Sequence, residues 1–495
     1  MKRIASALQK ASSARRAYAV FVLCAATATA LPAQTFTTLY NFTWSLGEPA
    51  AALVQATNGG LYGTTQYGGD GVNGADGTVF KITPGGTLTV YNFCSQGECT
   101  DGANPGYAAL VQATNGDLYG TTVSGGAAGA HGTVFKMTPA GVLTTLHSFH
   151  GPDGYGTFAG LVQAANGDLY GTTPGGGVNV GGTVFKITPG GTLTTIYSFC
   201  SQSGCADGDE PIAGLVQAVN GDFYGTTYFG GVGGCGDGCG TVFRITPSGT
   251  LTTLVSFDGA DGGNPMAGLV QATNGDFYGT TMLGGAYGQG TIFKITPGGT
   301  LTTLYSFCSQ SGCADGAQPF AALVQATDGD FYGTTAAGGA ASAACSSEVE
   351  LGCGTIFKIT PSGTLTTLYS FCPQSGCLDG IEPLAGLVQA TNGNFYGTAA
   401  LGGDSGGGTI FSLSMGLGPF VETQTTSGEA GAAVKILGSD LTGATSVTFN
   451  GTPATFTVVS RYLITTTVPA GATTGKVQVV TPSRTLSSNV PFRVP

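Results

Sequence analysis

The cysteines are the residues whose spacing points most clearly to chemistry in this chain of 495 residues. Apart from Cys24, twelve cysteines fall into six pairs that are close in sequence, four of them with the spacing Cys-x4-Cys. The pairs are Cys94/Cys99, Cys200/Cys205, Cys235/Cys239, Cys308/Cys313, Cys345/Cys353 and Cys372/Cys377. An even number of locally paired cysteines favours disulfides that pin loops. A metal site is the alternative, although the chain has only three His and no Cys-x2-Cys pair.

Carboxylates form the second set of candidate functional residues. Asp70 and Asp76 bracket one short segment, and Asp207, Asp209 and Glu210 form another cluster. Carboxylate and carbonyl oxygens are the ligands of calcium, so these five residues are the candidate calcium ligands. Because Asp also favours turns by bonding its own backbone, a structural role is the alternative. No other cofactor is expected.

The chain offers no convincing catalytic constellation. His131, His147 and His150 lie close together in sequence, but a His cluster alone defines no reaction. Gly403 to Gly407 matches Gly-x-Ser-x-Gly around Ser405. A nucleophile elbow needs a strand before the Ser and a helix after it, and a glycine-rich loop is expected here instead. We therefore assign no catalytic residue and interpret the match as chance.

These residues are embedded in a unit that recurs seven times, most clearly from Gly268 to Phe307. Each unit has four short apolar pieces, which we name A, B, C and D. They are Leu-Val-Gln-Ala, Tyr-Gly-Thr, Gly-Thr-Val/Ile-Phe and Leu-Thr-Thr-Leu-Tyr-Ser-Phe with variants. The pieces are rich in the β-branched and aromatic residues that favour strands. Asn-Gly or Asp-Gly separates A from B, and Thr-Pro-Gly or a variant separates C from D, as in tight hairpins.

The ends of the array predict how it closes. Phe36 to Phe42 is a D piece with nothing before it, and Gly408 to Met415 is a C piece with no D after it. Pairing these two ends would complete a seventh four-stranded sheet and hide exposed sheet edges. The sequence therefore predicts an all-β fold for residues 34–417: a seven-bladed β-propeller closed by an N-terminal strand.

Strand direction predicts two different faces for such a ring. A–B and C–D turns lie on one face, where they are short and uniform. B–C and D–A loops lie on the other face, which carries the length variation and all six cysteine pairs. We call the second one the variable face. Since binding usually resides in variable loops on a rigid scaffold, any ligand is expected there.

The chain resembles a known family at this point. The unit LVQATNGDFYGTT…GTIFKITPSGTLTTLYSF is similar to the GloVer tandem repeat of exported bacterial choice-of-anchor proteins. The resemblance covers roughly Phe36 to Met415 and implies a propeller and export. It brings no catalytic residues with it, because the family has no established activity.

Residues 418–495 follow a different pattern. Alternating segments such as Val434 to Gly438 and Ala444 to Gly451 predict a small immunoglobulin-like β-sandwich. The pattern Gly-x2-Val-x-Ile-x-Gly…Val-x-Phe-Asn-Gly resembles the IPT/TIG domain, which implies a spacer or a protein-contact module.

Residues 1–33 are expected to be a secretory signal peptide, with five basic residues before an apolar run that includes Ala17 to Ala28. Removing this segment shifts the net charge from −11 to −16. A surface this acidic repels phosphate backbones, which excludes nucleic acid as a partner. No segment is apolar and long enough for a confident transmembrane span. We expect a monomer that is secreted or located at the cell surface or in the periplasm.

The resulting hypothesis is an exported, non-enzymatic binding scaffold that contacts a glycan or a protein at the cell surface. The alternative is a carbohydrate-active enzyme of the lyase or lactonase type. Such an enzyme requires several carboxylates or His residues that converge at the channel mouth of the propeller. A binder can instead present shallow sites around the ring.

Overall fold

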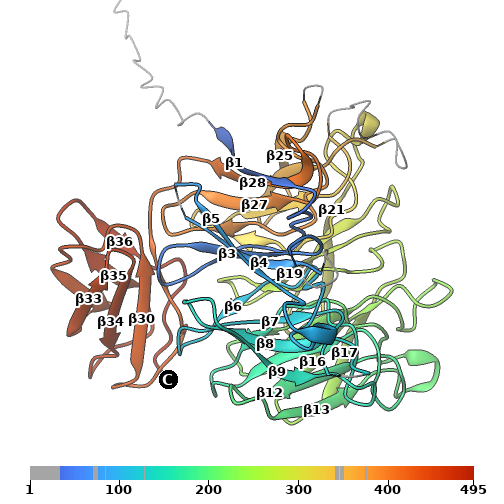
Figure 1. Cartoon of the computed structure of the whole chain (residues 1–495), viewed down its shortest axis with the longest axis horizontal. Coiled ribbons are helices and arrows are strands. Elements are labelled where there is room, and N and C mark those ends of the chain that lie inside the picture. Colours follow the sequence, from blue (N-terminus) through green and yellow to red (C-terminus); the bar gives the residue numbers. More distant parts are fainter. Residues whose placement is uncertain are drawn as a thin grey trace, which may run out of the picture.

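The computed structural model describes residues 34–70, 76–83, 85–127, 129–339, 345, 351–373 and 376–495. Within these ranges the chain contains strands and three short 3-10 helices, so the all-β prediction is confirmed (Figure 1). The predicted signal peptide lies outside the described residues. In the described part of the chain, no helix is long and apolar enough to cross a membrane.

The first part of the chain forms seven four-stranded antiparallel sheets, each in the order A-B-C-D. Sheets 1 to 3 are built as follows: β2 (Val54–Gln55), β3 (Leu61–Thr65), β4 (Thr78–Ile82) and β5 (Leu88–Asn92); β6 (Val111–Gln112), β7 (Leu118–Thr122), β8 (Thr133–Met137) and β9 (Leu143–Ser148); β10 (Val162–Gln163), β11 (Leu169–Thr173), β12 (Thr183–Ile187) and β13 (Leu193–Ser198). Sheets 4 and 5 comprise β14 (Val216–Gln217), β15 (Phe223–Thr227), β16 (Thr241–Ile245) and β17 (Leu251–Ser256), then β18 (Val270–Gln271), β19 (Phe277–Thr281), β20 (Thr291–Ile295) and β21 (Leu301–Ser306).

Sheet 6 comprises β22 (Val324–Gln325), β23 (Phe331–Thr335), β24 (Thr355–Ile359) and β25 (Leu365–Ser370). Sheet 7 combines β26 (Val388–Gln389), β27 (Phe395–Ala399) and β28 (Gly406–Ser414) with β1 (Thr35–Thr43) from the other end of the array. Strands β1 and β28 pair antiparallel, with Thr35 opposite Ser414 and Thr43 opposite Gly406.

The glycine of each Tyr-Gly-Thr piece allows two large side chains to pack over strand B. In sheet 5, a Cβ added to Gly279 would lie 2.6 Å from the Phe293 ring and 2.8 Å from a Leu269 methyl group. Strands B and C are almost entirely buried, whereas D is partly exposed. In each sheet the phenylalanine of strand C therefore packs against strand B at the glycine, where strand B has no side chain.

Neighbouring sheets are joined by a repeated hydrogen bond. A backbone N–H in the A–B turn of each sheet donates to the Gln side chain in the A strand of the next sheet. The seven bonds are Thr57 to Gln112, Thr114 to Gln163, Ala165 to Gln217, Val219 to Gln271, Thr273 to Gln325, Thr327 to Gln389 and Thr391 to Gln55, at 2.8–3.2 Å. The last bond runs from sheet 7 back to sheet 1, so the contacts form a cycle.

A fully buried phenylalanine at the end of each D strand packs in the interface with the next sheet. Phe42, from β1, packs with Phe80 of sheet 1 at a ring-centroid distance of 5.3 Å. Phe257 of sheet 4 packs with Phe293 of sheet 5 in the same way, at 5.2 Å. The N-terminal strand thus makes the same inter-sheet contact as an internal D strand.

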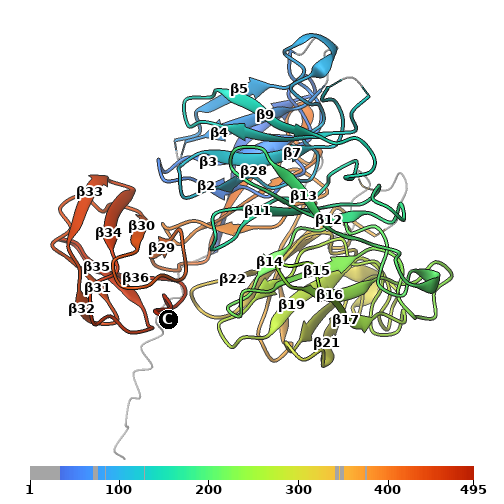
Figure 2. The same cartoon turned by 90° about the horizontal axis from the view of Figure 1, so that it is seen from below.

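The C-terminal part forms two further four-stranded sheets around a separate apolar core. One sheet comprises β29 (Val421–Thr423), β30 (Ala433–Gly438), β34 (Leu463–Thr467) and β33 (Phe456–Ser460). The other comprises β32 (Thr452–Pro453), β31 (Ser446–Phe449), β35 (Val477–Val480) and β36 (Thr485–Ser487). Figure 2 shows this sandwich at one side of the seven repeat sheets.

The sandwich contacts the face of the repeat sheets that carries the A–B turns. Lys435 Nζ donates to the Thr114 carbonyl at 2.7 Å, and the hydroxyl oxygens of Thr391 and Ser439 are 2.9 Å apart. The Tyr462 ring lies directly against Gly59. These contacts involve the turns of sheets 1, 2 and 7, so the sandwich covers part of the face opposite the variable one.

Two local features differ from the sequence-based expectation. The A strands are only two residues long, because the flanking Leu and Ala lie outside the ladder. Three of the Cys-x4-Cys loops contain a short 3-10 turn: η1 (Gly97–Cys99), η2 (Ser203–Cys205) and η3 (Ser311–Cys313). Closure of such a short span between two cysteines favours this tighter turn.

Candidate functional site

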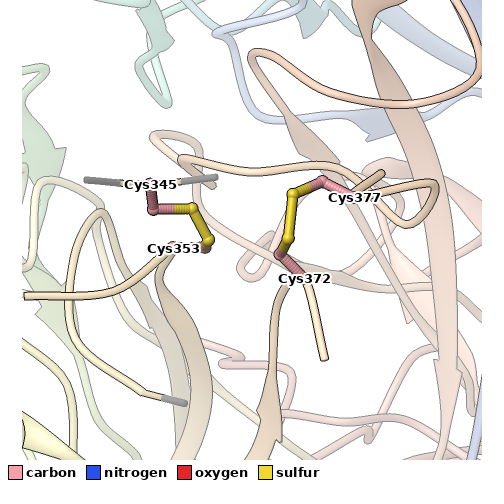
Figure 3. Close-up of side chains that lie close together, drawn as sticks. All are labelled: Cys345, Cys353, Cys372 and Cys377. Atoms are coloured by element: carbon pink, nitrogen blue, oxygen red, sulfur yellow. A yellow bond between two sulfur atoms is a disulfide. The ribbon is translucent and has the colours of Figure 1, made fainter. Parts of the chain in front are cut away.

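The six predicted cysteine pairs are disulfides in the structure. Their Cα–Cα distances are 4.0–5.4 Å. All six lie in B–C or D–A loops, on the variable face. Two of them, Cys345–Cys353 and Cys372–Cys377, are neighbours, with their four sulfur atoms within 4.8 Å of one another (Figure 3). The disulfides therefore stabilise the loops of this face, as the spacing predicted.

Several of these loop cysteines are also buried. Cys239 is the clearest case, because it has no exposed surface and belongs to the apolar core cluster that contains Val242 and Phe257. Its partner Cys235 is exposed in the B–C loop of sheet 4. Cys239 is a core residue because it lies just before β16, where its carbonyl accepts the Asn264 N–H of the next D–A loop. The disulfide thus ties an exposed loop to the core, and Cys239 itself is inaccessible to a ligand.

Four of the other five pairs also include at least one buried cysteine. Besides Cys239, six cysteines are buried: Cys94, Cys99, Cys313, Cys353, Cys372 and Cys377. The pairing predicted from the spacing is therefore confirmed, whereas these seven residues contribute to packing beneath the variable face rather than to its surface.

The calcium candidate Asp207 holds a loop closed. Its carboxylate accepts hydrogen bonds from the backbone N–H groups of Ser201 and Gln202, and from the hydroxyls of Ser201 and Tyr197, at 2.8–3.1 Å. Burial opposes ionisation, but these four donors outweigh it and lower the pKa of Asp207. Asp315 has the same set of partners in the loop after sheet 5. Asp207 and Asp315 thus have the same structural role in their loops.

The other calcium candidates lie in two different loops. Asp70 and Asp76 belong to the B–C loop of sheet 1, where residues 71–75 lie outside the described part. The Asp76 carboxylate lies within 4.8 Å of the sulfurs of Cys94 and Cys99. Asp209 and Glu210 line a cleft near the disulfide Cys200–Cys205. Calcium binding at these residues stays a prediction.

An Asp follows five of the seven A–B turns, and it forms ion pairs that the sequence analysis did not predict. It approaches the basic residue of strand C in the same sheet, with N–O distances of 2.8–3.9 Å. The pairs are Lys136–Asp117, Lys186–Asp168, Arg244–Asp222, Lys294–Asp276 and Lys358–Asp330. Every basic residue of the repeat region occupies this strand C position, so the loops of the variable face contain no Lys or Arg.

The histidines and Ser405 do not assemble into a catalytic group. His147 Nε2 contacts the Asp153 carboxylate at 2.7 Å, which places it where a Tyr contacts Asp in other loops. His150 Nδ1 contacts the Ser148 carbonyl at 2.7 Å. His131 lies edge-on to Tyr155. Ser405 directly precedes β28, a strand, so the helix that a nucleophile elbow needs does not follow it.

One position per repeat adopts an unusual backbone conformation on the variable face. It lies just before strand A, and it has positive φ in every unit. The seven residues are Glu48, Asn104, Gly156, Glu210, Asn264, Gln318 and Glu382, with φ of 53–69°. A non-glycine residue rarely adopts this conformation, so the surrounding contacts must impose it.

Two backbone hydrogen bonds impose this conformation between neighbouring sheets. The Glu210 N–H donates to the Gly181 carbonyl of sheet 3, and the Glu210 carbonyl accepts from Tyr228 N–H of sheet 4. The N–H bond recurs at all seven positions, and the carbonyl bond at six. These polar side chains are thus placed at regular intervals on the variable face. Their sequence signal is a recurring polar residue before proline, as in Asp-Gly-x-Glu-Pro.

Three of these positions are Glu48, Glu210 and Glu382. The surroundings of Glu48 and Glu382 disfavour the ionised carboxylate. Burial raises the pKa of Glu382. Burial, and then the neighbouring Glu382, raises the pKa of Glu48. Burial and the charges of Tyr67, Glu48 and Glu382 raise the pKa of Tyr107. Carboxylates from sheets 7 and 1 therefore lie close to tyrosines of the B–C and D–A loops.

Exposed apolar side chains are concentrated in the same loops. Of the twelve large apolar side chains that are strongly exposed in the described residues, nine lie in B–C or D–A loops. They are Trp44, Tyr67, Tyr107, Tyr155, Val178, Val180, Val232, Tyr287 and Leu378. The variable face therefore combines exposed aromatic rings with carboxylates and, by sequence, has no Lys or Arg.

The fold and this face define a class: an all-β repeat protein with a decorated loop face and an appended sandwich domain. The family described as the Gloeobacter/Verrucomicrobia repeat matches residues 25–237, 202–347 and 233–456, and the chain belongs to this family. The IPT/TIG domain matches residues 419–494. Both resemblances noted in the sequence are therefore confirmed. No curated protein matches the chain.

Several solved structures are similar to this chain at low identity. A proposed 6-phosphogluconolactonase from Bacteroides uniformis is 17% identical over 65% of this chain and 84% of its own, with a TM-score of 0.42. A protein from Lactobacillus plantarum is 16% identical over 65% and 84%, with a TM-score of 0.40. A protein of unknown function from Bacteroides thetaiotaomicron is 14% identical over 77% and 76%, with a TM-score of 0.37. Scores this low carry no argument about function.

Proposed function

We propose that this chain is an exported, non-enzymatic binding scaffold whose seven repeat sheets are the blades of a closed β-propeller. The cycle of A–B turn to Gln hydrogen bonds supports seven blades in a ring. The pairing of β1 with β28 supports closure by the N-terminal strand. Such a ring is a rigid platform that holds its loops in fixed positions.

The ligand face in this proposal is the variable face. The observation that carries it is the concentration of exposed aromatic and aliphatic side chains in the B–C and D–A loops. Exposed apolar groups that gather on one face of a soluble domain are available for contact with a ligand. The opposite face is partly covered by the IPT/TIG domain, through contacts such as Lys435 with Thr114.

The charge of the variable face favours a neutral ligand over an anionic one. Tyrosine rings can stack on the apolar face of a sugar ring, and carboxylates can accept hydrogen bonds from sugar hydroxyls. An anionic polymer would meet Glu48, Glu210 and Glu382 with no Lys or Arg to balance its charge. A neutral glycan therefore fits better than a uronate, a sulfated glycan or a nucleic acid.

Export is part of the proposal. Six disulfides favour an oxidising compartment. The basic and apolar residues of the first 33 positions supply the expected signal peptide.

A glycan array probed with the secreted full-length protein tests the function. We expect binding to neutral glycans and no binding to anionic ones, with and without calcium. A blank array would contradict the glycan-binding function and leave protein contact as the binding mode.

An enzymatic function is the second candidate, because the raised pKa values of Glu48 and Glu382 suit proton transfer. Lyase and lactonase assays on the wild type and Glu382→Gln test it. Turnover that the substitution abolishes would favour the enzyme, whereas absence of turnover on substrates that bind would favour the scaffold.

A further inference from the structure

We propose that a cleft between sheets 3 and 4 on the variable face binds one unit of a neutral sugar. The cleft is open to solvent and has a volume of about 500 Å3, within the usual range for small-molecule sites. Three loops line it: the D–A loop before sheet 3, the B–C loop of sheet 3 and the D–A loop after it. This inference rests on the proposed function and names the site and the ligand class.

The walls of the cleft combine apolar and polar groups as a sugar ring requires. Tyr155, Phe158 and Ile212 contribute the apolar surface, and Asp209 and Glu210 contribute the carboxylates. A pyranose has an apolar face formed by its C–H groups and a rim of hydroxyls, so it can satisfy both kinds of wall. Tyr155 is exposed, and its ring lies directly against the backbone of Gly175.

Tyr155 is held at its backbone and contacted at its ring. Its N–H donates to the Gly175 carbonyl at 3.0 Å, and its ring lies edge-on to His131. A Cβ at Gly175 would lie 2.2 Å from the ring, so the ring takes this position because residue 175 is a glycine. An aromatic ring held in this way loses little entropy when a ligand binds.

The cleft lies where one unit departs from the repeat. At the position before strand A, sheet 3 has Gly156, whereas the other six units have Glu, Asn or Gln. In the other six units, a backbone N–H of the B–C loop donates to the carbonyl of the residue at this position. Pro174 occupies the place of that donor in sheet 3, and proline has no N–H to donate. Gly156 and Pro174 lie side by side, since a Cβ on Gly156 would be 3.9 Å from Pro174. The loop next to Pro174 therefore lacks both a side chain and a backbone hydrogen bond that the other six units have.

Backbone strain marks the same wall. Val180 lines the cleft with φ of +69°, and its side chain is strongly exposed. A β-branched residue rarely adopts this conformation, and such strain accumulates at binding sites.

The carboxylates of the cleft favour neutral ligands over anionic ones. Burial raises the pKa of Asp209 and of Glu210, and Asp209 raises that of Glu210 further. Among the described residues that line the cleft there is no Lys, Arg or His, so an anionic group entering it would meet only like charge.

The test measures binding of the full-length protein to neutral gluco-, manno-, galacto- and xylo-oligosaccharides by isothermal titration calorimetry, with oligogalacturonate as the anionic probe. Three variants alter the cleft: Tyr155→Ala, Glu210→Gln and Gly156→Asn, the last restoring the side chain found in sheets 2 and 5. The matched control is Tyr287→Ala, an exposed tyrosine in the B–C loop of sheet 5, outside the cleft. Circular dichroism and thermal melting verify that each variant folds.

We expect micromolar to millimolar binding of at least one neutral oligosaccharide, weakened about tenfold or more by Tyr155→Ala and Gly156→Asn. Tyr287→Ala should change Kd less than about twofold. If the wild type binds and the cleft variants bind equally well, the cleft assignment is wrong while the binding function stands. If the wild type binds no oligosaccharide, both fail for these ligands. Tighter binding of oligogalacturonate would overturn the assignment of a neutral ligand.

Discussion

Truncation of Phe42 tests whether the N-terminal strand is an integral part of the ring. Phe42 has no exposed surface and packs with Phe80, as Phe257 packs with Phe293 in the middle of the array. Replacement of a fully buried Phe by Ala costs about 3–5 kcal/mol, through lost burial and the cavity that remains. If β1 closes the ring, Phe42→Ala and Phe257→Ala should therefore lower the free energy of unfolding by similar amounts.

The assay is urea denaturation followed by circular dichroism, with the free energy taken from the midpoint and slope of the transition. Val142→Ala, at a 61% exposed position in a C–D turn, is the control and should change stability by less than about 0.5 kcal/mol. A cost below about 1 kcal/mol for Phe42→Ala, with the full cost for Phe257→Ala, would refute closure by β1.

Three further predictions concern packing and charge. Gly279→Ala forces a Cβ to within 2.6 Å of Phe293, so it should destabilise by about 1–3 kcal/mol in thermal melts, whereas Gly97→Ala, with open space around it, should have little effect. Burial raises the folded-state pKa of Glu382 above its usual value of 4.5. Between the unfolded-state and folded-state pKa values the folded protein binds more protons, so the free energy of unfolding falls as pH rises through that range. Glu382→Gln should therefore gain stability relative to the wild type as pH rises, and an unchanged pH profile would contradict this. Hydrogen bonds lower the folded-state pKa of Asp207 below 3.8, so its ionised carboxylate stabilises the fold at neutral pH. Asp207→Asn should lower the free energy of unfolding by about 2 kcal/mol at pH 7, and the difference from wild type should become smaller in acid, where wild-type Asp207 is protonated.

Much of the fold follows from local sequence signals. The β-branched and aromatic pieces predict the strands, and Asn-Gly and Thr-Pro-Gly predict the turns, because each turn type requires those backbone conformations. Repetition then multiplies each local signal, so a weak two-residue A strand such as Val270–Gln271 is still found. The disulfides are predictable as well, since partners such as Cys308 and Cys313 are close in sequence. The burial of Cys239 was not, because it depends on side chains from the next sheet.

The site was less predictable, because it depends on contacts between sheets. Glu48 and Glu382 are far apart in sequence and become neighbours only when sheet 7 meets sheet 1. The cleft was also missed, although Gly156 and Pro174 were visible as departures from the repeat. Whether such a departure leaves an opening depends on the surrounding side chains. The Asp207 carboxylate shows the opposite case, where a candidate ligand is engaged by its own loop.

Hydrogen–deuterium exchange of the wild type, with and without a neutral oligosaccharide selected on the array, tests the location of ligand binding most directly. We predict protection in the B–C and D–A loops, strongest in residues 150–181 and 200–212, with A–B turns and residues 419–494 unchanged. Protection confined to the A–B turns or to the IPT/TIG domain would contradict the assignment of the variable face as the ligand-binding surface.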